Sequence, residues 1–176
     1  MTSLAELIAD SWFPFTGSVE VKPLDPRVVP EPLRHGAGGL DCDGCTKPDD
    51  AFVWTNEHWR LSAYHESPFP GVVLLNTRAH FDSYADLPDD LLAELGPLTA
   101  RVERAVLAIG DVARVHVARW GDGGEHFHQW FLPRPLGMLQ ARGSMLPMWM
   151  DLLPSLPADV IEAALAQIAT ALRASG

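Results

Sequence analysis

The stretch GDGGEHFHQWFLPR, residues 121–134, sets two histidines at alternate positions behind a glycine-rich turn. Side chains alternate between the two faces of a β-strand, so His126, His128 and Trp130 are predicted to share one face. The glycine turn lets backbone approach a ligand closely and can offer N–H groups to an anion. This pattern suits metal or nucleophilic chemistry. A half-buried strand whose histidines are merely accommodated is, on this stretch alone, an equally good interpretation.

The composition limits the classes of partner. A chain of 176 residues is expected to form one domain with a substantial core. Its net charge of -10 argues against a nucleic-acid backbone or an anionic membrane as the main partner, but not against a small phosphorylated ligand in a local basic pocket. No stretch has the pattern of a signal peptide or the length of a membrane span. We therefore expect a cytoplasmic protein.

The chain has two cysteines, Cys42 and Cys45, and they form a Cys-x-x-Cys pair in the turn-rich segment 42–50. In a reducing compartment such a pair is typical of metal binding or redox chemistry. The segment lacks the strand-then-helix context of a thioredoxin-type site, which favours metal binding. A metal site of this kind needs two further ligands.

Hydrophobic periodicity predicts both strands and helices. Residues 51–68 alternate as two short strands, and residues 71–80 form a more apolar strand that should be central and buried on both faces. Residues 87–110 carry an apolar stripe at helical spacing, and Gly96-Pro97 is expected to kink or split this helix. Together these patterns predict an α+β fold.

The second half of the chain adds a hairpin and a terminal helix. Residues 111–121 alternate as a strand that should pair with 126–132, and Pro133 is expected to end that pairing. Residues 157–175 predict an amphipathic helix. The segment 136–157 holds four of the five methionines, which fits a pocket lid or a dimer surface or, with somewhat more weight, ordinary core packing.

Residues 126–134, HFHQWFLPR, resemble the signature of the histidine triad (HIT) superfamily. That signature has three histidines at alternate positions, then apolar residues and often Pro-Arg. In this alignment His126 is the first histidine and His128 the middle one, while Trp130 replaces the third. The galactose-1-phosphate uridylyltransferase branch and some dinucleoside polyphosphate phosphorylases also lack the third histidine, but they carry glutamine there.

The resemblance extends over residues 42–135. The strand 71–80 ends in Arg78 and His80, and the superfamily commonly has a strand there, followed by a basic residue and a histidine. The order of helix and hairpin is also shared. The resemblance implies a HIT-like antiparallel sheet of about five strands with a long helix and a C-terminal helix. It divides the chain into an N-terminal arm, 1–41, and a single HIT-like domain, 42–176, of which 136–176 is a C-terminal extension.

The resemblance also implies a structural zinc site. Several superfamily members bind zinc through a Cys-x-x-Cys pair, a histidine after the central strand and the first signature histidine. Two thiolates and two imidazoles suit tetrahedral Zn²⁺, and a closed set of four protein ligands is the structural type. Carried over to this chain, the ligands are Cys42, Cys45, His80 and His126. The alternatives are a reduced cysteine pair without metal, or His35 in place of one of these histidines.

In HIT enzymes the middle histidine attacks the α-phosphorus of a nucleotide derivative, so the resemblance implies that His128 is the nucleophile. A neutral imidazole suits this role near pH 7, and a covalent nucleotidyl-histidine divides one hard substitution into two easier steps. An indole at position 130 has one N–H donor and no base, so it can donate to an oxygen, stack on a base or block the phosphate. The expected substrate contacts are Trp130, Gly123, Gly124, Glu125, Arg78 and Arg119. For Glu125 and each arginine, a solvent-exposed role is the simpler alternative.

Three functions follow. The first is a HIT-like hydrolase or nucleotidyltransferase that acts at the α-phosphate of a nucleotide-type ligand through nucleotidyl-His128, with a structural zinc. HIT proteins are often homodimers, and the resemblance implies the same state here. The second is a zinc-stabilised binding protein for a nucleotide or small molecule without turnover, which Trp130 favours. The third is a zinc-dependent hydrolase in which His126 and His128 are both ligands and an open position holds water.

Overall fold

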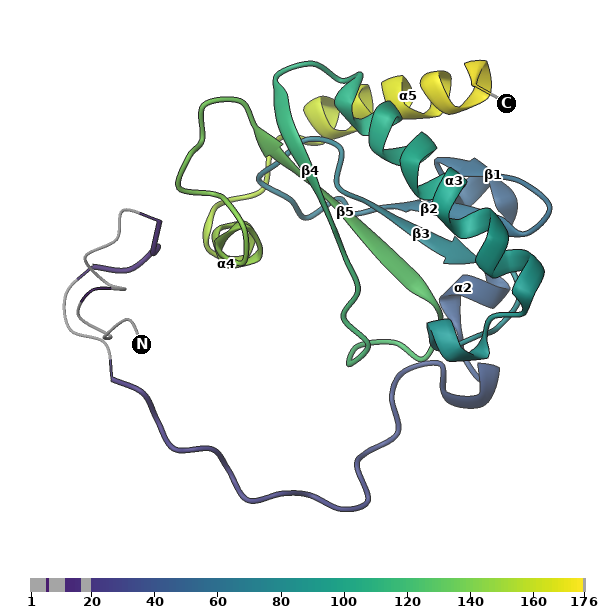
Figure 1. Ribbon diagram of the computed structural model, residues 1–176, viewed down its shortest axis with the longest axis horizontal. Helices are drawn as coiled ribbons and strands as arrows, with labels where there is room; N and C mark the ends of the chain where they lie inside the picture. Colours follow the sequence, from purple (N-terminus) through teal and green to yellow (C-terminus); the bar gives the residue numbers. More distant parts are fainter. Residues whose placement is uncertain (1–5, 7–11, 17–19, 176) are drawn as a thin grey trace.

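The computed structural model describes residues 6, 12–16 and 20–175, and its centre is a five-stranded antiparallel sheet in the order β1-β2-β3-β5-β4 (Figure 1). The strands are β1 (Trp54–Thr55), β2 (Trp59–Ala63), β3 (Val73–Thr77), β4 (Val112–Ala118) and β5 (His128–Pro135). The helices are α2 (Asp43–Thr46), α3 (Asp89–Leu107), α4 (Met145–Leu152) and α5 (Ala158–Ala174), with 3-10 turns at Ala37–Gly39, Asp49–Ala51 and Tyr84–Asp86. This arrangement confirms the predicted α+β sheet, with β3 at its centre.

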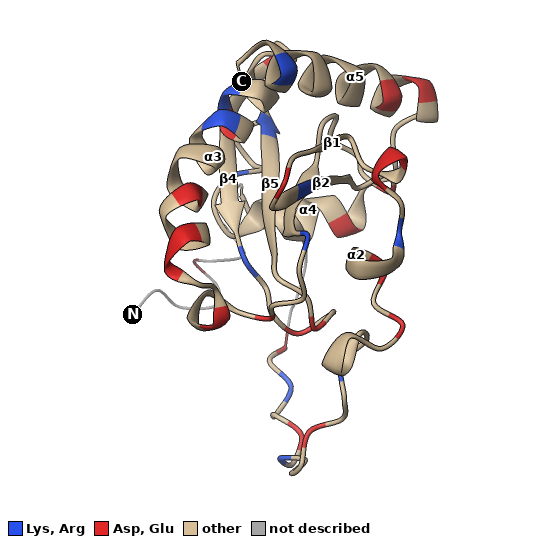
Figure 2. Ribbon diagram, turned by 90° about the vertical axis from the view of Figure 1, so that its right-hand side faces the viewer, with Lys and Arg blue, Asp and Glu red and all other residues tan. Residues whose placement is uncertain are grey.

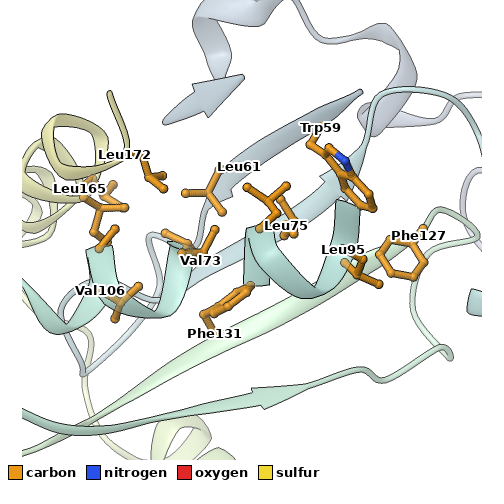
Figure 3. Close-up of a cluster of buried hydrophobic side chains, with 14 of the residues drawn as sticks. Trp59, Leu61, Val73, Leu75, Leu95, Val106, Phe127, Phe131, Leu165 and Leu172 are labelled. Carbon is orange, nitrogen blue, oxygen red and sulfur yellow. The ribbon is translucent and has the colours of Figure 1, made fainter. Parts of the chain in front are cut away.

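The main core lies between one face of the sheet and the two long helices, α3 and α5 (Figure 3). In α3 the apolar side chains recur every three or four residues, which turns one stripe of the helix toward the sheet. Burying each large apolar side chain contributes about 2 kcal/mol. Fully buried members of this core include Trp59, Leu61, Val73, Leu75, Val106, Phe127, Phe131, Ile168 and Leu172.

The other face of the sheet carries a smaller core beneath α4. Leu146 of α4 is buried together with Phe69, Val72 and Leu132, and Trp149 packs against the group at its edge. The helical part of segment 136–157 therefore packs on the sheet, as the core-packing interpretation expects. On the rest of this face Leu74, His128 and Trp130 are partly exposed.

The helix is not split at Pro97, and the expected end of strand pairing at Pro133 is wrong. Helix α3 runs as one element through Pro97, because the apolar stripe on both sides is held against the sheet and outweighs the cost of about 3 kcal/mol for an interior proline. Strand β5 begins at His128 and continues past Pro133, which pairs with Val115 of β4. The pairing of β5 with β3 ends at Phe131, so beyond that point β5 has a neighbour on one side only, where a proline is tolerated.

Charged side chains are spread over the surface. Figure 2 shows acidic positions along α3 and around the lower loops, whereas the basic positions are scattered singly. No helix in the described residues is long and apolar enough to cross a membrane.

The N-terminal arm is described in part, because its residues 1–5, 7–11 and 17–19 lie outside the described ranges. Residues 20–33 have no helix or strand and form the long outer loop in Figure 1. Their apolar side chains are exposed, and Leu24 is 98% accessible. The arm rejoins the domain at Arg34, next to the glycine turn.

Candidate metal centre and active site

Four side chains converge where β3 ends and β5 begins. Cys42 precedes α2 and Cys45 lies within it, so the expected turn-rich loop contains one helical turn, in which the Cys45 N–H donates to the Cys42 carbonyl at 3.0 Å. His80 follows β3, and His126 immediately precedes β5. Antiparallel pairing of β3 with β5 brings the two histidines together although 46 positions separate them in the chain.

The spacing of these side chains suits a metal ion. One ligand atom from each of Cys42, Cys45, His80 and His126 lies within 4.8 Å of the other three. The sulfur of Cys42 is 3.2 Å from Nδ1 of His126, and the sulfur of Cys45 is 3.5 Å from Nδ1 of His80. A tetrahedral zinc ion with two sulfur and two nitrogen ligands separates its ligand atoms by about 3.3–3.8 Å. The four predicted ligands are therefore placed together at metal-binding spacing.

The imidazole of His126 is oriented for this role. Its Nε2–H donates to the Thr77 carbonyl at 2.8 Å, so the lone pair of Nδ1 faces the cysteines. A second hydrogen bond of this kind fixes the tautomer and ring orientation of metal-binding histidines. Burial lowers the pKa of His126, which keeps the ring neutral. Burial, together with neighbouring Cys42, raises the pKa of the Cys45 thiol to about 11, so a bound cation has to displace its proton.

Gly44 leaves the space that the His126 ring occupies, and this gives a first testable prediction. A Cβ at position 44 would lie 2.9 Å from three atoms of that ring. Gly44→Ala is therefore expected to push the ring aside and weaken metal binding about tenfold or more, the usual effect of disturbing what supports a ligand. Competition with a chelator of known affinity measures the change.

Gly96→Ala is the matched control for this substitution. Position 96 lies inside α3 with nothing within 4 Å of an added Cβ, so metal affinity should not change. The free energy of unfolding should rise by up to about 1 kcal/mol, because alanine is a better helix former than glycine. Unaltered metal affinity in Gly44→Ala would show that the ring of His126 is not held where the structure places it.

His128 lies outside the metal-ligand cluster, and a hydrogen bond from its Nδ1 orients the ring. Its Nδ1 is 2.7 Å from the carbonyl oxygen of His126. With Nδ1–H as the donor, the lone pair of Nε2 is free, which is what a nucleophile requires. The two histidines therefore donate a hydrogen bond from different ring nitrogens: Nε2 in His126 and Nδ1 in His128. The cluster found among the described residues contains His126 and not His128, which gives no support to a site in which both are ligands.

Asn76 borders His128 and Ser62 binds Asn76, and both were missed by sequence reasoning. Asn76 pairs directly with His128 across β3 and β5, and it is 8% exposed. Its amide donates to the Ser62 hydroxyl at 2.7 Å and to the Leu74 carbonyl at 2.9 Å. The available signal was one amide within the apolar run GVVLLNT. These hydrogen bonds fix the Asn76 amide on the strand next to the His128 imidazole.

The glycine turn is held by the arm. The Glu125 N–H donates to the His35 carbonyl at 2.8 Å, and the Glu125 carboxylate accepts from the Gly38 N–H at 2.9 Å. His35 and Gly124 also form an isolated bridge. Glu125 and Gly124 are thus occupied in attaching the arm, while Gly123 has open space around it. His35 meets the turn and is not part of the metal-ligand cluster.

Arg34 completes this attachment and was also missed. Its guanidinium donates to the Gly121 carbonyl at 2.7 Å and forms a two-pronged ion pair with Asp82, with distances of 2.5 and 2.9 Å. Donation by Arg34 lowers the pKa of Asp82, which keeps the carboxylate charged. The turn before the two histidines is therefore fixed from outside the sheet.

The two arginines expected to bind phosphate are engaged elsewhere. Arg78 donates to both carboxylate oxygens of Asp49, at 2.7 and 2.9 Å. Arg119 donates to the Asp82 carbonyl and lies 5.7 Å from the ring centroid of Phe127, which belongs to the main core on the opposite face of the sheet. The structure does not bring either guanidinium to His128.

Comparison with known proteins places this geometry in a known fold. No family model matches the chain, and no curated protein matches its sequence. Solved structures do match. A hypothetical histidine triad nucleotide-binding protein from Sulfolobus tokodaii strain7 has a TM-score of 0.55 and 18% identity over 70% of this chain and 84% of its own. The chain has the histidine triad fold.

Two further histidine triad proteins support this assignment. One, from Marinobacter aquaeolei VT8, has a TM-score of 0.57 and 15% identity over 71% of this chain and 90% of its own. The other is a Zn-bound histidine triad family protein from Mycobacterium smegmatis, with a TM-score of 0.53 and 17% identity over 80% of this chain and 92% of its own. The predicted fold is therefore confirmed.

Within this HIT fold the third signature position is Trp130, on the same sheet face as His128. Its ring centroid lies 5.2 Å from that of Tyr64 and 6.0 Å from that of Trp120, both in edge-to-face arrangements. In the sheet, Trp130 pairs with Leu74 on one side and Ala118 on the other. The position two residues after His128 is thus aromatic, where the HIT signature has a third imidazole.

Proposed function

We propose that this chain is a HIT-like nucleotide-processing enzyme, a hydrolase or nucleotidyltransferase, that acts at the α-phosphate through a nucleotidyl-His128 intermediate. The observation that carries the proposal is the 2.7 Å hydrogen bond between Nδ1 of His128 and the His126 carbonyl. It fixes the tautomer that leaves the Nε2 lone pair free, on a side chain that is partly exposed. The shared fold adds support, because the S. tokodaii protein is described as nucleotide-binding.

In the proposed reaction His128 is the side chain that forms a bond to the substrate. Nε2 attacks the α-phosphorus and forms a P–N bond, while the bond from phosphorus to the leaving group breaks and the leaving group takes the electron pair. The imidazole then carries positive charge, which the His126 carbonyl stabilises by accepting from Nδ1–H. Water or an acceptor hydroxyl next attacks phosphorus and loses its proton to the departed anionic leaving group or to solvent, and the P–N bond breaks with its electron pair returning to Nε2, which restores neutral His128.

We infer that the metal is Zn²⁺ and that its role is structural. Two thiols and two imidazoles are a zinc ligand set, and four protein ligands leave no position for substrate. The HIT-fold protein from M. smegmatis is Zn-bound. Zinc would hold the ring of His126, whose carbonyl orients His128, so its effect on the reaction is indirect. The chain's own residues carry the chemistry.

A zinc-stabilised binding protein is the second candidate, and Trp130 is the observation that favours it. An indole cannot take or give a proton in the way that the third histidine can. With Arg78 and Arg119 paired elsewhere, neither is available to hold a phosphate beside His128. This candidate keeps the ligand, a small phosphorylated and nucleotide-type molecule, and the expected homodimer, but has no turnover.

A turnover assay separates the two candidates. Metal-loaded protein is incubated with a panel of nucleoside phosphoramidates, dinucleoside polyphosphates and nucleotide sugars, and products are resolved by chromatography. His128→Ala is compared with His65→Ala, a matched control because His65 is an exposed histidine whose side chain is 62% accessible. Product from the wild type and His65→Ala, but not from His128→Ala, supports the enzyme. No product across the panel from folded, metal-loaded wild type would favour the binding protein.

A further inference from the structure

Three aromatic rings form a group beside His128 that the proposed reaction does not use. Trp130 comes from β5, Tyr64 follows β2, and Trp120 follows β4. Trp130 meets the other two edge-to-face at 5.2 and 6.0 Å. Trp120 is 43% exposed. The group therefore joins three neighbouring parts of the sheet and keeps part of its surface open.

One side of this aromatic group is braced by the smaller core. Tyr64 and Trp130 pack against the cluster beneath α4, which includes the buried side chains of Phe69 and Leu132. Aromatic side chains have few rotatable bonds, and bracing removes part of the freedom that binding would otherwise cost. The rings thus form a rigid surface before any ligand arrives.

The group is within reach of a substrate held at His128. Trp130 follows His128 by two residues on the same face of β5, a separation of about 7 Å along a strand. On the β4 side Trp130 has only the methyl group of Ala118 as its cross-strand neighbour, and Trp120 follows two residues later. Between the two indoles the strand therefore presents only the small side chain of Ala118.

The indole N–H groups are available to a ligand. In the part of the chain that the structure describes, neither Trp130 nor Trp120 has a hydrogen-bond acceptor for its Nε1–H, whereas Trp59 donates to Glu94 at 2.8 Å and Trp149 to the Trp12 carbonyl at 3.2 Å. The two indoles are therefore partly exposed rings with free N–H donors.

We propose that Trp130, Trp120 and Tyr64 form a subsite that binds a planar aromatic ring of the substrate next to the phosphorus attacked by His128. This inference rests on the proposed function for the identity of the reacting atom, but the binding it describes does not require turnover. The ring is either the base of the transferred nucleotide or an aryl group on the departing side. Stacking on aromatic side chains improves affinity by about tenfold or more per ring.

Two matched pairs of ligands test the subsite by calorimetric titration of the metal-loaded protein. Adenosine 5′-phosphate is compared with ribose 5-phosphate, and phenyl phosphate with methyl phosphate. In at least one pair the aromatic member should bind about tenfold more tightly. Preference in the first pair places the nucleotide base in the subsite, and preference in the second places the aryl leaving group there. Equal affinities within both pairs, or no binding by any of the four, would overturn the proposal.

Variants separate ring recognition from general damage to the fold. Trp130→Leu should remove the preference for the aromatic member and leave the affinity for its partner unchanged. Trp120→Ala lies at an exposed position outside the strands and should remove part of the preference. It replaces Trp130→Leu in the test if that variant does not fold. Trp54→Leu, in β1, is the matched control and should keep the preference. An equal loss for both members of a pair would show that Trp130 acts only through packing.

The outcomes for the two proposals are independent. A ring preference that depends on Trp130, together with no turnover across the substrate panel, would sustain the subsite and sink the enzyme. Turnover that depends on His128, together with equal affinity within each pair, would sustain the enzyme and sink the subsite.

Discussion

Cys42→Ser is expected to release the metal and to lower the free energy of unfolding by about 3–5 kcal/mol, a large effect for one substitution. Cys42 is 2% exposed, and its sulfur lies 3.2 Å from the ligand nitrogen of His126. A serine hydroxyl fills nearly the same space but is not a zinc ligand of comparable strength. The remaining three ligands would leave the metal without a fourth protein ligand.

Elemental analysis and urea unfolding measure this change together. The variant should carry less than a tenth of the wild-type metal per chain, and its unfolding midpoint should fall. Wild type stripped with a chelator is the control and should unfold near the same urea concentration as Cys42→Ser, which would assign the loss to the metal and not to packing. Full metal content in Cys42→Ser, or stripped protein as stable as loaded protein, would contradict the structural role.

His128→Ala is expected to reduce turnover of a substrate found in the panel by at least about 10³-fold, mainly through kcat. The side chain supplies the attacking lone pair, and no other imidazole of the signature has a free nitrogen, because Nε2 of His126 donates to Thr77 and its Nδ1 faces the cysteines. His128 is partly exposed, so the fold should lose about 1 kcal/mol or less.

Addition of imidazole to the variant sharpens this test. A small nucleophile that enters the vacated space should restore part of the turnover in His128→Ala and have no effect on the wild type. Metal content should equal that of the wild type, since His128 is not a member of the metal-ligand cluster. A variant that retains more than a tenth of wild-type kcat would rule out His128 as the nucleophile.

Much of the fold could be predicted because its periodicities are strong. The apolar stripe of α3 and the alternation of β4 and β5 are local patterns, and each leaves one face that has to be buried. The errors concern the expected split at Pro97 and the expected end of pairing at Pro133, because tertiary packing outweighs the local preference at both positions. A helix held along its whole length against a sheet accommodates an interior proline, and a strand that is paired on one side can continue through one.

The candidate metal site was predicted partly from its chemistry and partly from the resemblance. The Cys-x-x-Cys pair predicts metal binding from the residues alone, but the choice of His80 and His126 among seven histidines came from the resemblance to the HIT superfamily. The contacts of the glycine turn were not predictable. Arg34 lies 87 positions from Gly121 and 48 from Asp82, and no periodicity connects them. The pairing of Arg78 with Asp49 was hidden for the same reason.

The measurement that tests the central claim most directly is the mass of the protein during turnover. Metal-loaded wild type is mixed with a substrate from the panel, quenched in alkali to preserve an acid-labile P–N bond, and analysed intact and after digestion. The account predicts one nucleotidyl group per chain, located on His128 and absent from His128→Ala. Turnover without this adduct, or an adduct on another residue, would contradict it.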